Sequence, residues 1–168
     1  ENGNKIVHCH GVFDLLHVGH LRHFDQAKAL GDILIVTITA DKHVNKGPHR
    51  PAFTEVLRAE AISSLEQVDY VAINYTPTAT FAIQQICPDF YVKGEDYKNA
   101  SQDRTGGIDE EKSAVSSVNG KIVFTEDITF SSSELLNNYL PNFSTDTVDY
   151  LRDFSSRYSI ESIDKLLE

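Results

Sequence analysis

Residues 5–39 read KIVHCHGVFDLLHVGHLRHFDQAKALGDILIVTIT, and this stretch decides the fold class. Two short apolar runs, residues 5–9 and 32–39, have the composition of buried strands. Between them, apolar side chains recur three and four positions apart over residues 18–30, which predicts an amphipathic helix that ends at Gly31. Two strands joined by one helix form a parallel pair with a right-handed crossover.

The same alternation continues as far as residue 140. Further strands are expected at residues 68–73, 89–93 and 121–125. Further helices are expected at residues 76–86, 109–118 and 131–140, and one is capped by Thr54 and carries an apolar stripe of Leu57, Ala61, Ile62 and Leu65. We therefore predict a Rossmann-like, doubly wound α/β domain with a mainly parallel five-stranded sheet and helices on both faces.

The pattern changes after Pro141, where strands no longer alternate with helices. Residues 147–154 and 159–167 predict two short amphipathic helices. We expect one α/β domain at residues 1–141. Residues 142–168 are expected to form a helical extension that packs on the domain or a linker towards a second domain.

Composition narrows the class of protein. With 168 residues, of which 40% are hydrophobic and 24% charged, the chain fits one soluble domain, and its apolar runs are too short to cross a membrane. Cys9 and Cys87 do not predict a disulfide framework, so a cytoplasmic location is expected. A formal net charge of −10 argues against nucleic-acid binding, which rests on basic side chains.

An anionic ligand would need a local basic site, and the sequence contains one. All seven histidines lie between His8 and His49, with Lys42, Lys46 and Arg58 close behind. In an open α/β sheet, ligands bind beyond the carboxyl ends of the strands, so the loop after the first strand is the first candidate.

That loop reads GVFDLLHVGH, residues 11–20. It is neither a dinucleotide fingerprint nor a P-loop. His17 and His20 lie three apart at a helix start, where the helix dipole and free N–H groups favour a triphosphate, and Gly19 leaves room for a phosphate. The alternative is that these histidines only cap the helix or face solvent.

The decapeptide resembles the signature of the cytidylyltransferase-like nucleotidyltransferase superfamily. The resemblance covers roughly residues 5–140. It includes Lys46 followed by Arg50 and Pro51, then Arg58, the segment YVKGEDYK at 91–98, and the serine-rich helix start at Ser131. The chain is most similar to the adenylyltransferase domain of the bifunctional enzymes that make ADP-heptose, and next to glycerol-3-phosphate cytidylyltransferase.

The resemblance implies roles for particular residues. Those expected to hold and activate the phosphates are His17, His20, Lys46 and Arg58. Those expected to bind the nucleotide are Gly11, Val12, Phe13, Asp14, Gly19, Lys93, Gly94, Asp96, Tyr97, Ser131 and Ser132. The alternatives are solvated surface charges for Lys46 and Arg58 and ordinary turn residues for Asp96 and Tyr97. Asp14 is expected either to hold backbone amides of its own loop or to help to position a metal.

The implied reaction joins a nucleoside monophosphate to a phosphorylated acceptor and releases pyrophosphate. Mg²⁺ is expected to arrive with the nucleotide, and we name no protein metal site. Residues 126–132 lack the arginine that the alcohol-phosphate cytidylyltransferases carry there, which favours ATP and a sugar phosphate such as heptose 1-phosphate.

Two other functions stay open. One is a CTP-dependent enzyme acting on glycerol phosphate or another alcohol or sugar phosphate, and the other is a nucleotide-binding module without turnover. The resemblance also implies a homodimer, and fusion to a sugar kinase domain in the full-length protein.

Overall fold

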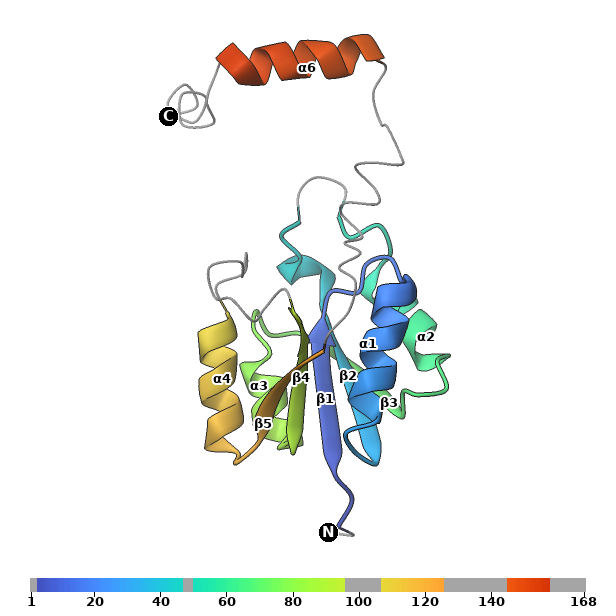
Figure 1. Cartoon of the computed structure of the whole chain (residues 1–168), viewed down its shortest axis with the longest axis vertical. Helices are drawn as coiled ribbons and strands as arrows, with labels where there is room; N and C mark the ends of the chain where they lie inside the picture. Colours follow the sequence, from blue (N-terminus) through green and yellow to red (C-terminus); the bar gives the residue numbers. More distant parts are fainter. Residues whose placement is uncertain (1–2, 47–49, 96–106, 126–144, 158–168) are drawn as a thin grey trace. The chain divides into compact units, whose positions relative to one another are not determined.

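The computed structural model describes residues 3–46, 50–95, 107–125 and 145–157. The chain divides into two compact units, Glu1–Ser132 and Ser133–Glu168, which are considered separately. The first unit is an α/β domain and contains every strand that the structure describes (Figure 1).

A five-stranded parallel sheet forms the centre of the first unit. Its strands are β1 (Ile6–Gly11), β2 (Ile33–Thr39), β3 (Tyr70–Asn74), β4 (Phe90–Gly94) and β5 (Lys121–Thr125). They lie in the order β3-β2-β1-β4-β5, and each neighbouring pair is parallel. The five strands and their parallel pairing confirm the sequence prediction, with most strand ends displaced by one or two residues.

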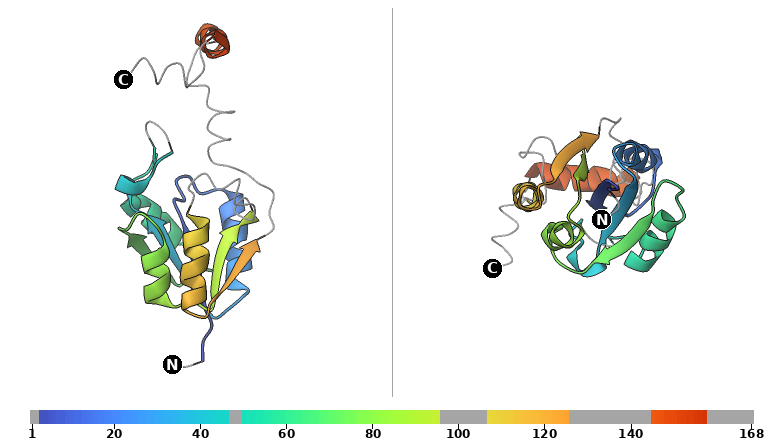
Figure 2. Two further views of the ribbon diagram at one scale, coloured as in Figure 1. Left: turned by 90° about the vertical axis from the view of Figure 1, so that its left-hand side faces the viewer. Right: turned by 90° about the horizontal axis from the view of Figure 1, so that it is seen from below.

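Helices cover both faces of this sheet, as predicted (Figure 2). The helices are α1 (Val18–Lys28), α2 (Glu55–Ser63), α3 (Thr80–Ile86) and α4 (Ile108–Ser117), with a 3₁₀ turn, η1 (Asp41–His43), after β2. Phe24 of α1 and Ile62 of α2 belong to one core cluster, whereas Ile83 of α3 and Val115 of α4 belong to another. The first pair of helices therefore covers one face and the second pair covers the other.

Two helix predictions need correction. The expected apolar stripe of α2 is wrong in part, because Leu57 is 50% exposed and Ala61 is also exposed, while Arg58 and Ile62 are the buried residues. The helix after β3 begins at Thr80 and not at Thr76. There the Asn74 side chain holds a turn by donating to the carbonyls of Thr76 and Thr78, so these residues are not available to the helix.

The second unit contains α6 (Thr145–Arg157), which overlaps the predicted helix at 147–154. The helices expected at 131–140 and 159–167 lie outside the described residues. Within the ranges that the structure describes, no helix is both long and apolar enough to span a bilayer.

Candidate functional site

The strand order places a topological switch point beside β1. From β1 the chain runs outward through β2 to β3, then crosses back to β4 and β5 on the other side of β1. Helices leaving β1 and β4 therefore diverge, and ligands of open α/β sheets bind at such a switch point, beyond the carboxyl ends of the strands. The loop that ends in His17 and His20 begins directly at this edge, after Gly11 (Figure 1).

His17 is the N-cap residue of α1. Its Nδ1 accepts a hydrogen bond from the Gly19 N–H at 3.1 Å, and its carbonyl accepts from the His20 N–H at 2.9 Å. Because Nδ1 is the acceptor, the proton of the neutral ring lies on Nε2, which makes Nε2 a donor. The capping role considered from the sequence is thus real. It also uses two of the N–H groups that were expected to be free for a phosphate.

His20 stacks on His17, with ring centroids 3.9 Å apart and an interplanar angle of 27°. Burial, followed by electrostatic interactions with His17, His23 and Lys46, lowers the pKa of His20 to about 3. A backbone hydrogen bond with Leu15 acts in the opposite direction and is outweighed. The structure therefore brings His17, His20 and Lys46 together, with a neutral imidazole at the centre of the group.

Phe13 supports this pair from the core. Its ring meets the His20 ring edge-on at a centroid distance of 5.3 Å and packs on Phe24 at 5.1 Å. A Cβ on Gly11 would lie 3.0 Å from the Phe13 ring, so the glycine allows this close packing. Phe13 and Gly11 thus act on the site by positioning His20.

Asp14 clamps the loop after β2 to the loop after β1. Its carboxylate accepts from Arg50 Nε at 2.5 Å, from the Ala52 N–H at 2.6 Å and from the Phe53 N–H at 3.4 Å, and its side chain is 1% exposed. Asp14 was considered for holding amides of its own loop, but the amides that it holds belong to the other loop, and a role in positioning a metal stays a prediction. The clamp joins the segment after Lys46 to the histidine loop.

Arg58 has a different environment from the one expected. It is 2% exposed, and its guanidinium donates to the carbonyls of Val12, Thr39 at 2.8 Å and Phe53 at 3.0 Å, and to the carboxylate of Asp41 at 2.6 Å. These groups lie at the ends of β1 and β2 and in the loop before α2. Arg58 therefore braces the site from behind, and a direct contact with phosphate stays a prediction.

Lys93 lies near the carboxyl end of β4 and is also buried. Its Nζ is 3.0 Å from Glu111 Oε2 of α4, and both side chains are less than a tenth exposed. Gly94 follows as the last residue of the strand and pairs with Thr125 of β5. Glu111 was missed from the sequence because it is 18 positions from Lys93 and has the ordinary appearance of an acidic residue in the first turns of a helix.

Some of the remaining expected residues lie within the described structure and others lie outside it. Gly19 lies in the first turn of α1, and Val12 contributes its carbonyl to Arg58. Asp96, Tyr97, Ser131 and Ser132 lie outside the described residues. In the part of the chain that the structure describes, no three His, Cys, Asp or Glu side chains form a group that could hold a metal ion.

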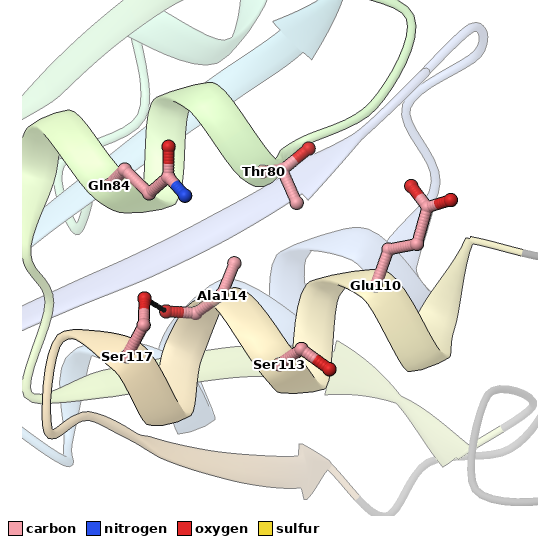
Figure 3. Close-up of a pocket in the computed structure, with 6 residues that line it drawn as sticks. All are labelled: Thr80, Gln84, Glu110, Ser113, Ala114 and Ser117. Carbon is pink, nitrogen blue, oxygen red and sulfur yellow. Dashed lines mark hydrogen bonds between the residues drawn. The ribbon is translucent and has the colours of Figure 1, made fainter.

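A groove of about 400 Å³ lies elsewhere, between α3 and α4 (Figure 3). Its lining consists of Thr80, Gln84, Glu110, Ser113, Ala114 and Ser117. None of these six residues is cationic, and Glu110 would repel an anion. The groove therefore does not suit a phosphorylated ligand, and the candidate site remains at the sheet edge.

Fold and site together define a class of protein. A doubly wound parallel sheet with two stacked histidines at the first helix start, and a lysine beside them, is a Rossmann-like domain suited to binding nucleotide phosphates.

The comparisons with known proteins identify the family. A model of the cytidylyltransferase-like family matches residues 8–155. The chain belongs to this family, and its class is that of a nucleotidyltransferase.

Curated relatives include the bifunctional protein HldE of Helicobacter pylori strain G27, which is 48% identical over 101 residues, covering 59% of this chain and 22% of the relative. The bifunctional protein HldE of Nitratiruptor is 44% identical over 100 residues, with 58% and 22% covered. The matched segment thus spans about a fifth of the length of these relatives.

Solved structures share the fold. A lipopolysaccharide core biosynthesis protein from Thermoplasma volcanium is 28% identical with a TM-score of 0.63, covering 76% of this chain and all of the other. A pantoate-β-alanine ligase from Francisella tularensis is 16% identical with a TM-score of 0.55, covering 89% of this chain and 69% of the other, and it supports the fold alone.

Proposed function

We propose that this domain transfers AMP from ATP to a sugar phosphate similar to heptose 1-phosphate and releases pyrophosphate. The observation that carries the proposal is the stacked pair of His17 and His20 at the start of α1, within reach of the charge of Lys46. In a chain with a net charge of −10, this local group of cationic and N–H donors offers a triphosphate a compatible surface.

The reaction needs alignment and charge stabilisation more than covalent chemistry. An oxygen of the acceptor phosphate attacks the α-phosphorus in line, and the bond from that phosphorus to the β-phosphate oxygen breaks, so pyrophosphate leaves with the electron pair. No covalent enzyme intermediate is required. The donor on His17 Nε2, the His20 ring and the Lys46 ammonium would stabilise the negative charge that grows on the phosphates.

ATP would enter as its Mg²⁺ complex. The nearest carboxylate in the histidine loop, Asp14, is committed to Arg50 and two backbone amides, so we assign the ion's ligands to the triphosphate and water. Arg58 and Asp14 would act as positioning residues, because they hold the loops that carry His17 and Lys46.

Two features favour ATP and a sugar phosphate. The segment Val92-Lys93-Gly94, followed by Asp96 and Tyr97, resembles the ADP-heptose branch of the family, and residues 126–132 lack arginine. The similarity to a lipopolysaccharide core biosynthesis protein agrees with a role in sugar activation. A CTP-dependent enzyme acting on an alcohol phosphate is the second candidate. Because the HldE relatives are bifunctional, we also propose that a sugar kinase accompanies this domain in the full-length protein.

The test is pyrophosphate release from ATP, CTP, GTP and UTP with Mg²⁺, each against a panel of sugar 1-phosphates and alcohol phosphates. We expect release with ATP and one sugar 1-phosphate. Release only with CTP and an alcohol phosphate would support the second candidate. Nucleotide binding without release from any pair would contradict catalysis and support a binding module.

Replacement of the two histidines tests the mechanism. We expect His17→Ala and His20→Ala each to lower kcat by about 10²–10³-fold while the domain stays folded, because each removes a group aimed at transition-state charge. His43→Ala is the matched control, since the His43 Nε2 already bonds to the Tyr75 carbonyl at 3.0 Å. Near-normal kcat in both test variants would exclude the mechanism.

A further inference from the structure

A ladder of hydrogen bonds joins β1 and β2 on the face covered by α3 and α4. His8 Nε2 lies 2.8 Å from Thr37 Oγ1, His10 Nδ1 lies 2.8 Å from the same oxygen, and His10 Nε2 lies 3.2 Å from Thr39 Oγ1. The His8 ring also packs on Tyr91 at a centroid distance of 5.2 Å, and Tyr91 belongs to the core cluster of α3 and α4. None of these contacts takes part in the mechanism proposed above.

The ladder runs from the closed interior to the edge of the site. His8 is fully buried and Thr37 is 3% exposed, whereas Thr39 is 8% exposed and His10 is only half-buried. The Thr39 end of the ladder is also connected to the histidine loop through shared partners. Arg58 donates to the carbonyls of both Thr39 and Val12, and His10 is followed directly by Gly11, where that loop begins.

Both ladder histidines are neutral, so the hydrogen bonds of the ladder run in one direction. Burial, with a further contribution from Lys93, lowers the pKa of His8 to about 3 and that of His10 well below its usual value. The Nδ1 of His8 is buried and has no hydrogen-bond partner among the described residues. A buried N–H without an acceptor is rarer than a buried acceptor without a donor, so the His8 proton lies on Nε2.

The direction of the other hydrogen bonds in the ladder follows from the position of this proton. The His8 Nε2–H donates to Thr37, the Thr37 hydroxyl donates to His10 Nδ1, and the His10 Nε2–H donates to Thr39. The hydrogen of the Thr39 hydroxyl is not used within the ladder. It is therefore a donor at the Thr39 end of the ladder, oriented by three bonds behind it.

A buried ion pair lies beside the ladder. Lys93, which is close enough to lower the pKa of both histidines, is paired with Glu111 at 3.0 Å. The lysine nearest the ladder thus has a carboxylate beside it, whereas Lys46 is the charged group near His17 and His20. An anion would favour the His17 side, and an uncharged hydroxyl or ring oxygen would suit the ladder.

We propose that Thr39 and His10 form a hydroxyl-recognition subsite that binds the sugar part of the acceptor, next to the phosphate site of His17 and His20. This subsite rests on the proposed function, because that function makes the acceptor a sugar phosphate. The subsite adds the residues that select the sugar. Neither residue belongs to the signature loop. Thr39 would touch the sugar, and His10 would orient the Thr39 hydroxyl.

The experiment compares ADP with ADP-heptose as ligands of the whole chain by calorimetry. The difference in affinity between them measures the contribution of the sugar. We expect Thr39→Val to weaken ADP-heptose about five- to tenfold, which is the usual effect of one uncharged hydrogen bond, and to leave ADP unchanged. Thr39→Ser restores the hydroxyl and should recover the wild-type affinity ratio.

His10→Asn supplies the second variant. The asparagine side chain keeps the bond to Thr37 from the position of His10 Nδ1, but it does not reach Thr39. The affinity ratio should therefore fall as in Thr39→Val. Equal weakening of ADP and ADP-heptose in these variants would show a general structural role and overturn the subsite, as would an unchanged ratio. Melting temperatures identify any variant that is not folded.

Pyrophosphate release by the wild-type chain separates the two proposals. Turnover of a sugar phosphate together with an unaltered affinity ratio in Thr39→Val overturns only the subsite. Absence of turnover with every sugar phosphate, while the ratio still depends on Thr39, overturns only the proposed reaction. A wild-type chain that turns over no sugar phosphate and binds ADP-heptose no more tightly than ADP overturns both.

Discussion

Arg58 shows how one side chain can hold several loops in a site. Its guanidinium has hydrogen bonds to three backbone carbonyls and to Asp41, whose own N–H donates to Glu55 at 2.7 Å while the Glu55 N–H returns a bond to Asp41 at 3.1 Å. Planar arginine can form such a set of bonds because its donors have fixed directions. The ends of β1 and β2 and the start of α2 therefore depend on this residue.

Replacement of Arg58 should destabilise the domain as well as slow the transfer reaction. We expect Arg58→Ala to lower the free energy of unfolding by about 3–5 kcal/mol, because three backbone carbonyls and Asp41 lose the donors of a buried guanidinium. Arg58→Lys should give an intermediate value, since one ammonium cannot replace the planar set of donors. Urea denaturation measures the free energy of unfolding of both variants.

Arg157→Ala, at an exposed arginine of α6 that pairs with Asp153, is the control and should change stability by less than about 1 kcal/mol. If the Arg58→Lys variant were as stable as the wild type, the bracing role of the guanidinium would be contradicted.

At the level of elements, one ion pair ties β4 to α4. Lys93 and Glu111 are both almost completely buried, and the charged atoms of the two side chains lie 3.0 Å apart. Removal of one member of a buried ion pair lowers the free energy of unfolding strongly, whereas replacement of both members by apolar residues does not always do so. The pair thus fixes the position of Lys93 near the carboxyl end of β4 by coupling it to the packing of α4.

A double-mutant cycle measures this coupling. Lys93→Met and Glu111→Leu should each lower the free energy of unfolding by about 3–5 kcal/mol, because each leaves one buried charge without this partner, and the double variant should recover most of the loss. Lys112→Ala, which breaks an exposed pair with Asp109, should cost less than about 1 kcal/mol. Additive effects of the two core replacements in urea denaturation would contradict the coupling.

For the whole molecule, the buried histidines make stability depend on pH. His8 and His20 have a pKa of about 3 in the folded state, and that of His10 is also well below 6.5, so the unfolded chain binds more protons below that value. The stability that these neutral histidines contribute is therefore fully present above pH 6.5. It is lost as the pH falls from 6.5 towards 3.

We expect the free energy of unfolding to fall with decreasing pH between 6 and 4. Each histidine contributes a slope of up to about 1.4 kcal/mol per pH unit, and the three together up to about 4 kcal/mol per pH unit. Urea denaturation at several pH values measures the slope. His8→Gln removes one titrating group, so a slope unchanged by this replacement would show that His8 is not responsible.

The sequence by itself determined the class of fold and named the candidate site. Apolar runs and helical periodicity are local properties, and parallel strands joined by helices leave few possible topologies, so the five-stranded sheet followed from the alternation of elements. The decapeptide ending in His17 and His20 was readable for a similar reason. Its residues are contiguous, and their spacing at a helix start places both rings together.

Only the tertiary structure decided which side chains meet across the sheet. Arg58 joins Val12, Thr39 and Phe53, contacts that the sequence did not predict, and Leu57 was expected in the core and is exposed. The pairing of Lys93 with Glu111 and the ladder from His8 to Thr39 likewise connect residues far apart in the chain. Strand order and register bring these groups together, and no local pattern encodes a contact whose partner is tens of residues away.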